Sequence, residues 1–189
     1  MQQRQHALTT LRRSAAGDPP VERIVADALD IIQSLLDADH SAYGSLRAGE
    51  DSLLLTVGRG WEDGVIGRAR LATDPTSLAG HTLSLGRPLI IEDLRFAPQF
   101  RPEPVLIAAG TRGLLLTTVR GQRGTSGLLG AFTSRRRLYS PEDGDFLRAL
   151  SDVIAAALYR EDWRQQIASR HPNRRAPPGG DSAPPEPSR

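Results

Sequence analysis

The stretch that constrains the fold most contains two strand-like runs followed by a strongly marked helix. Residues 114–119 are apolar or β-branched, and residues 128–132 form a second apolar run. Between them lie three glycines, which allow the chain to reverse: Gly121, Gly124 and Gly127. The pattern predicts a β-hairpin that leads, through the basic elbow Arg135, Arg136 and Arg137, into a long helix.

The start of that helix is marked by four consecutive residues. Ser140 supplies a capping hydroxyl, Pro141 suits the first helical position, and Glu142 and Asp143 place acids in the first turn. Apolar residues then recur at helical spacing: Phe146, Leu147, Leu150, Val153, Ile154, Ala157 and Leu158. The predicted helix, residues 141–166, therefore carries an apolar stripe that must pack against its own domain or a second copy.

The rest of the chain adds a helix at one end and short strands in the centre. In chain order the pattern predicts a helix over 21–36, strands over 41–46 and 53–57, a strand over 67–72, a helix over 75–86, a strand over 89–91 and a helical turn over 105–109. This order predicts an α+β domain with a central antiparallel sheet of about five to six strands and the end helices packed on one face.

The composition divides the chain into three parts. We expect the folded domain over residues 20–168. Residues 1–19 form an arm that is either a short helix or a frayed terminus, since Leu8 and Leu11 are its only large apolar side chains. Residues 169–189 include six prolines and no large apolar residue, so we expect a disordered tail.

The charge and the missing cysteines exclude several functions. The net charge is +2, and all 24 basic residues are arginine. The two ends are basic, which leaves 17 arginines against 20 acids between residues 17 and 168, so a nucleic-acid partner is not expected. The absence of cysteine excludes thiol catalysis and thiolate metal sites. No apolar run reaches membrane-spanning length and no signal peptide is present, so we expect a cytoplasmic protein without a membrane partner.

Several local patterns, in order and at similar spacing, carry a resemblance to a known family. They are residues 57–61 (VGRGW), residues 77–83 (SLAGHTL) running into 86–94 (GRPLIIEDL), the hairpin, and residues 139–143 (YSPED) before the last helix. Together, residues 21–166 resemble a GAF domain, the small-molecule sensor module of signalling proteins. The resemblance implies a ligand between the sheet and the middle helices and loops.

The resemblance narrows the chemistry mainly by exclusion. GAF-type methionine sulfoxide reductases use cysteines, and this chain has none. The chromophore-contacting Asp-Ile-Pro pattern of phytochrome-like domains is absent, and the lysine of the cyclic-nucleotide signature is missing. Haem needs a proximal histidine, and His81 is the one histidine in the pocket-forming region. No cofactor is assigned, and we expect a regulatory protein and not an enzyme.

The polar and aromatic candidates for the ligand site are Trp61, His81, Asp93, Phe96, Phe100, Arg101 and Thr117. Each also has a structural interpretation. Trp61 follows a strand and is typical of a ring that covers a core, a lone helical histidine is usually hydrogen-bonded, and Glu92 with Asp93 terminates a strand. Exposure to solvent explains Arg101 equally well. For the basic elbow Arg135–Arg137, a solvated segment is the favoured interpretation over a phosphate site.

Two functions follow from these observations. The first is a GAF-type sensor that binds an unknown small molecule and relays to a partner signalling protein. The alternative is a ligand-free GAF homodimer that acts as a protein-interaction module, because apolar residues dominate the middle segment. Residues 141–166 span about 39 Å as a helix, longer than a small domain is wide. We therefore expect a homodimer through the two end helices, with a monomer as the other possibility.

Overall fold

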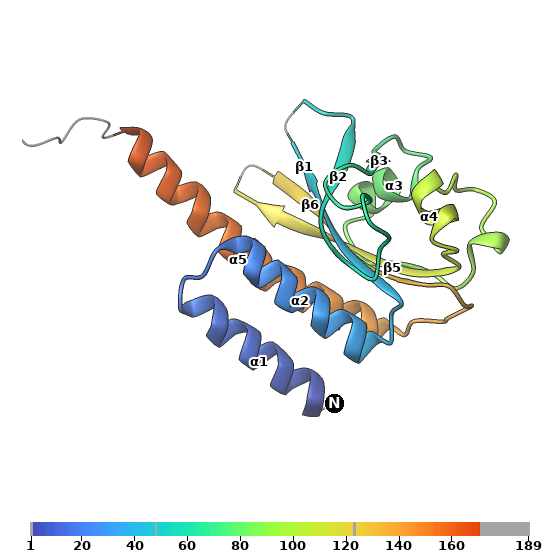
Figure 1. Cartoon of the computed structure of the whole chain (residues 1–189), viewed down its shortest axis with the longest axis horizontal. Helices are drawn as coiled ribbons and strands as arrows, with labels where there is room; N and C mark the ends of the chain where they lie inside the picture. Colours follow the sequence, from blue (N-terminus) through green and yellow to red (C-terminus); the bar gives the residue numbers. More distant parts are fainter. Residues whose placement is uncertain (1, 48, 123, 171–189) are drawn as a thin grey trace, which may run out of the picture.

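The computed structural model describes residues 2–47, 49–122 and 124–170, and of residues 168–170 the backbone alone. The predicted disordered tail lies outside the described residues. Six strands form one antiparallel sheet in the order β3-β2-β1-β6-β5-β4 (Figure 1). The strands are β1 (His40–Leu46), β2 (Ser52–Arg59), β3 (Arg70–Ala72), β4 (Leu89–Ile91), β5 (Gly113–Gly121) and β6 (Gly124–Thr133). The predicted α+β fold with its antiparallel sheet is confirmed.

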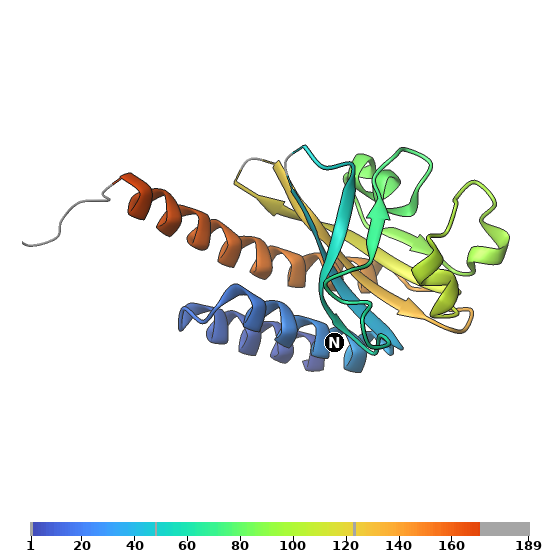
Figure 2. The ribbon, with the colours of Figure 1, turned by 45° about the horizontal axis from the view of Figure 1, so that its top comes forward.

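Helices cover both faces of the sheet. They are α1 (Gln2–Ala16), α2 (Val21–Leu36), α3 (Leu78–Leu85), the 3₁₀ turn η1 (Leu94–Phe96), α4 (Pro104–Ala108) and α5 (Pro141–Arg170). Figure 2 shows α1, α2 and α5 together on one side of the sheet, with α3 and α4 on the other. The expectation that both end helices share one face is confirmed.

Two apolar clusters hold these layers together. Alternate side chains of β5 and β6 belong to one cluster or the other. Leu115 and Val119 pack with α2 and α5, whereas Leu114 and Leu116 pack with α3 and α4. Successive side chains of a strand point to opposite faces, so an uninterrupted apolar run is the pattern of a strand buried on both sides. The strand predicted over 114–119 is therefore apolar on both faces because a helical layer covers each face.

The start of α5 is fixed by reciprocal hydrogen bonds. The Ser140 hydroxyl oxygen accepts from the backbone N–H of Asp143 at 3.2 Å, and the Asp143 carboxylate accepts from the N–H of Ser140 at 2.8 Å. This is a capping box, which satisfies two backbone donors that the helix leaves unpaired. The predicted start at Pro141 is confirmed.

The middle of the chain forms shorter elements than expected. The helix predicted over 75–86 begins at Leu78, because Ser77 caps it and accepts from the N–H of Gly80 at 2.9 Å. The strand predicted over 67–72 contains only Arg70–Ala72, since Gly67 has φ +83° and leaves the extended conformation. The N-terminal arm, for which two states were open, is helical from Gln2 to Ala16.

Helix α1 packs across α2 and α5 through a small apolar face. Leu11 and Ala15 are its buried residues, 2% and 4% exposed. The Ala15 carbonyl oxygen also accepts from the Arg160 guanidinium of α5 at 2.8 Å. The helical layer therefore contains α1 besides the two end helices that the sequence pattern predicted. No helix within the described residues is long and apolar enough to cross a membrane.

Candidate functional site

The structure does not bring the seven predicted site residues together. Thr117 is 2% exposed and lies on β5 between Leu115 and Val119, which face α2 and α5. Residues two apart share a face of a strand, so Thr117 faces the helical layer opposite α3 and α4. It is therefore separated from the side of the sheet on which the ligand site was expected.

Trp61 packs on the α3–α4 side of the sheet, next to two other aromatic rings. Its indole N–H donates to the Ser41 carbonyl oxygen at 2.9 Å. Its ring centroid is 4.9 Å from that of His40 and 5.4 Å from that of Phe132. These contacts favour the interpretation of Trp61 as a ring that covers the core.

His81, Phe100 and Arg101 lie together where α3 meets the segment before α4. The rings of His81 and Phe100 pack edge to face with centroids 5.0 Å apart. A parallel backbone bridge joins Ser77, the cap of α3, to Arg101. Arg101 is exposed at this position. These three residues are the part of the predicted set that the structure does bring together.

A buried carboxylate beside this group was missed by the sequence analysis. Glu103 precedes α4 and is 7% exposed, yet neither of its carboxylate oxygens has a hydrogen-bond partner within the described residues. Burial raises the pKa of the Glu103 carboxyl, and the negative charge of Asp74 raises it further. A glutamate before Pro104 has the pattern of an ordinary exposed helix start, so nothing in the local sequence signalled its burial.

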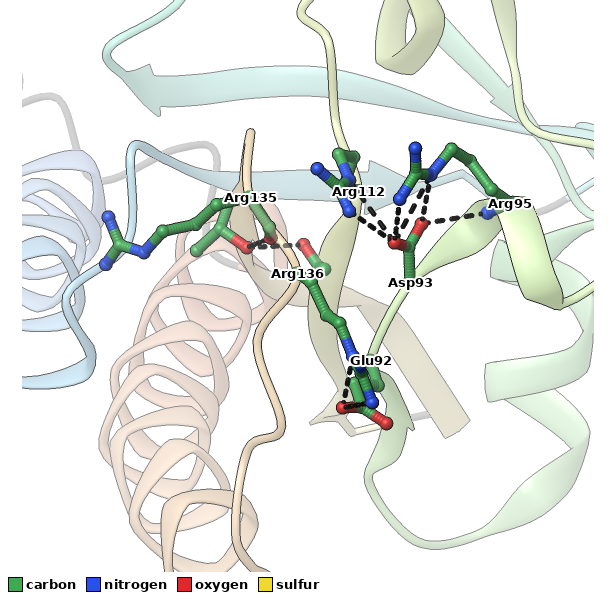
Figure 3. Close-up of polar contacts among 8 residues, drawn as sticks. Glu92, Asp93, Arg95, Arg112, Arg135 and Arg136 are labelled. Carbon is green, nitrogen blue, oxygen red and sulfur yellow. Dashed lines mark hydrogen bonds and ion pairs between the residues drawn. The ribbon is translucent and has the colours of Figure 1, made fainter.

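Asp93 lies at the end of β4 and is shared by two arginines (Figure 3). Its carboxylate accepts from the guanidinium of Arg95 at 2.8 Å and from that of Arg112 at 2.6 Å, and its side chain is 3% exposed. Hydrogen bonds from Arg95 and then Arg112 hold the pKa of this carboxyl well below its usual range. Asp93 also caps η1 by accepting from the N–H of Arg95 at 3.1 Å.

The elbow Arg135–Arg137 differs from the solvated segment that we expected. Arg136 pairs with Glu92 at 2.6 Å. Arg137 pairs with Asp37 at 2.7 Å, and Arg135 pairs with the same carboxylate. The side chains remain partly exposed, but each has an acid partner from a segment far away in the sequence. Figure 3 shows Arg135 and Arg136 pointing away from Asp93.

The space between the sheet and α3–α4 is occupied by the chain's own apolar side chains. Leu53, Leu78, Leu106 and Leu114 are each at most 2% exposed and belong to one cluster. Phe100 and Trp61 pack against the cluster from its edge. In the part of the chain that the structure describes, no three histidine or acidic side chains gather in a way that would hold a metal ion.

Comparison with known proteins identifies the family. The family model of the GAF domain matches residues 20–158. The chain belongs to the GAF family. We found no match among curated proteins. GAF domains are regulatory sensor modules. The match covers all six strands, the helices α2, α3 and α4, and most of α5.

Solved structures confirm the GAF fold. The GAF domain of a phosphoenolpyruvate-protein phosphotransferase from Coxiella burnetii is 18% identical with a TM-score of 0.74, over 87% of this chain and 96% of that chain. The corresponding domain from Acinetobacter is 13% identical with a TM-score of 0.73, over 87% and 98%. Free methionine-R-sulfoxide reductase from Neisseria meningitidis is 13% identical with a TM-score of 0.70, over 86% and 91%. At these identities the likeness concerns the fold alone.

Proposed function

We propose that this GAF domain is a regulatory, non-catalytic interaction module that forms a homodimer and relays signals to a cytoplasmic signalling partner through protein contacts. The proposal rests on one feature of α5. Tyr159, Trp163 and Ile167 follow one another at intervals of four residues, so they lie on one helix face, and they are 50%, 52% and 47% exposed. Large apolar side chains in a row at a surface are typical of a protein contact.

The surroundings of this row hold it in a fixed position. Arg164 donates two hydrogen bonds to the carboxylate of Asp18, at 2.8 and 2.9 Å. These bonds connect α5 to the loop between α1 and α2. Beside the row lies a groove of about 540 Å³ lined by Ala16, Asp18, Tyr159, Arg160, Trp163 and Arg164. In a two-fold dimer the same patch contacts itself, so an aromatic ring of one copy is placed to enter the groove of the other.

The burial of the predicted interface stripe supports a different contact surface from the one that the sequence suggested. Val153 and Ala157 lie in the predicted interface stripe but are 6% and 2% exposed, because α1 and α2 cover them within the same chain. A four-helix bundle of α2 and α5 from two copies would require α1 to leave. The projecting end of α5, visible at the far end of the helix in Figure 1, supports self-association without any rearrangement.

Native mass spectrometry of the purified protein tests this proposal. We expect a species of twice the 20.5 kDa chain mass that carries no small molecule, because apolar side chains fill the α3–α4 side of the sheet. A single chain at high micromolar concentration would contradict the homodimer. A bound molecule in every copy would favour the second candidate function.

That second candidate is the sensing of a small molecule at the α3–α4 layer, and Glu103 favours it. A buried carboxylate without a partner is costly, and a ligand with an ammonium or guanidinium group would supply the missing donors. The His81–Phe100 ring pair and Arg101 lie on the neighbouring segment. We propose these residues with Glu103 as the ligand-facing set of this alternative.

Replacing Glu103 distinguishes the two functions. In a ligand-free domain, Glu103→Gln is expected to raise the free energy of unfolding at pH 7.5 by about 1–2 kcal/mol, because a buried unpaired charge is removed. The folded-state pKa is raised, so the penalty begins as the pH rises above the ordinary value of 4.5 and is absent below it. The gain should therefore vanish at pH 4.

Thermal melts at the two pH values measure this effect, with Glu62→Gln at an exposed position as the matched control. The control should have the wild-type melting temperature at both pH values. If the variant is instead less stable than wild type at pH 7.5, the carboxylate has a cationic partner in the purified protein, and the sensor function is favoured.

A further inference from the structure

The edge of the sheet at β4 carries a positive charge that no carboxylate among the described residues neutralises. Asp93 contributes one negative charge to the guanidinium groups of Arg95 and Arg112. We propose that this arginine pair is a docking site for a carboxylate of an acidic protein segment, and that Phe96 beside it contacts an apolar side chain of the same segment. This surface would serve a partner protein, and it does not depend on self-association.

The hydrogen bonds of the pair leave donors available. Arg95 and Arg112 both use Nε and one terminal nitrogen, Nη2, to bind Asp93. In the described part of the chain, the second terminal nitrogen, Nη1, of each arginine donates to no acceptor. Figure 3 shows the two guanidinium groups lying side by side, both directed at the carboxylate of Asp93. A second carboxylate placed between them would find donors from both, in the planar geometry that arginine offers to carboxylates.

Exposure makes this geometry accessible to a partner. The side chain of Arg95 is 60% exposed and that of Arg112 is 32% exposed, whereas Asp93 is covered. Phe96, the next residue along η1, is 77% exposed, and the Arg95 guanidinium carbon lies 5.6 Å from its ring centre. The ring orders the guanidinium and offers an apolar surface next to the charge, a combination that is frequent at protein contacts.

The local charge favours a carboxylate over a phosphate or a nucleic acid. The three neighbouring arginines of the elbow Arg135–Arg137 add no excess, because they face three carboxylates: Asp37 and Glu92 pair with them, and Asp39 interacts with Arg135. One surplus positive charge matches one carboxylate, and a nucleic-acid site needs a broad basic surface that this region lacks. The site is also far from the proposed dimer surface. Figure 1 shows α4, which ends four residues before Arg112, at the opposite end of the molecule from the projecting end of α5.

The test is a binding titration with a synthetic peptide of alternating glutamate and leucine. Isothermal titration calorimetry at low salt measures the binding. The full chain should bind this peptide and not its glutamine–leucine counterpart, and the affinity should fall as sodium chloride is added. Arg95→Gln should weaken binding by at least about tenfold, because hydrogen bonds to a charged group are lost. Phe96→Ala should weaken it as well, since the apolar contact is removed.

Arg13→Gln is the matched control, since it removes one positive charge from an exposed site on α1. It should bind like wild type, and both it and Phe96→Ala should keep the wild-type melting temperature. Arg95→Gln removes one partner of the buried Asp93 carboxylate and should melt somewhat earlier, so far-UV circular dichroism at the assay temperature checks that this variant is folded. The dimer-disrupting variant Trp163→Glu should also bind normally, which separates this proposal from the proposed function. Equal binding by Arg95→Gln and Arg13→Gln would overturn the proposal. So would competition by inorganic phosphate at the same concentration as the peptide, or no binding at millimolar peptide.

Discussion

Leu150→Asp is expected to unfold the domain. Leu150 is fully buried in the cluster that joins α5 to α2 and the sheet. Truncating a buried leucine costs about 2–5 kcal/mol, and the substitution also buries a carboxylate without a partner. Together these costs approach the whole stability of an ordinary domain, which is about 5–15 kcal/mol. Far-UV circular dichroism and a thermal melt measure the loss.

Leu138→Asp is the matched control for this prediction. Leu138 is 72% exposed, so the same change of side chain removes little buried surface there. The control should melt like wild type. If Leu150→Asp also melts like wild type, α5 does not pack on the sheet through the stripe described above.

Trp163→Glu is expected to convert the homodimer into a monomer that remains folded. Trp163 is the middle residue of the exposed row on α5 and is 52% exposed in the single chain, so the change should leave the fold intact. A buried aromatic at the centre of an interface typically contributes 2 kcal/mol or more, so the dimer should dissociate at least about 30-fold more readily. Sedimentation velocity over a wide concentration range measures the change.

Gln165→Glu is the control for Trp163→Glu, because it adds the same charge two residues further along α5 on a different face. Gln165 is exposed in the structure. The control should sediment like wild type. A dimer that survives Trp163→Glu, or one that dissociates equally in both variants, would place the contact elsewhere.

The elements with strong local signals were predictable from the sequence. The helix over 21–36 has those bounds in the structure, and the capped start at Pro141 is present. Both depend on residues within a few positions of one another: an apolar stripe in the first case, and the cap Ser140 with its acids in the second. The GAF resemblance was recognisable because its motifs occur in order along the chain.

The candidate site was less predictable, because its contacts join distant segments. The partner of Arg137 is Asp37, one hundred positions away, so no local pattern indicated that they pair. The burial of Glu103 depends on how α4 folds over the sheet. Thr117 lies two residues from both Leu115 and Val119, so the sequence predicts that these three side chains share one face of the strand. It does not predict which helices cover that face.

Helix α1 shows the same limit. Two large apolar residues, Leu8 and Leu11, were too few to decide between a helix and a frayed end. In the structure α2 and α5 supply the surface on which Leu11 is buried, and Arg4 adds an ion pair with Asp143. Helices of this length are stabilised mainly by such packing. For the same reason, we propose the end of α5 as the dimer surface and not the stripe that α1 and α2 cover.

Cysteine cross-linking tests the proposed dimer most directly, because the chain contains no cysteine of its own. The variants Trp163→Cys and Gln165→Cys each introduce one thiol and no charge, so Trp163→Cys, unlike Trp163→Glu, should still associate at high micromolar concentration. Mild oxidation then links two chains only where the α-carbons lie about 4.4–6.8 Å apart. We predict a disulfide-linked dimer for position 163 and a monomer for position 165, on a denaturing gel without reductant. A monomer for position 163, or equal cross-linking at both positions, would contradict self-association through Tyr159, Trp163 and Ile167.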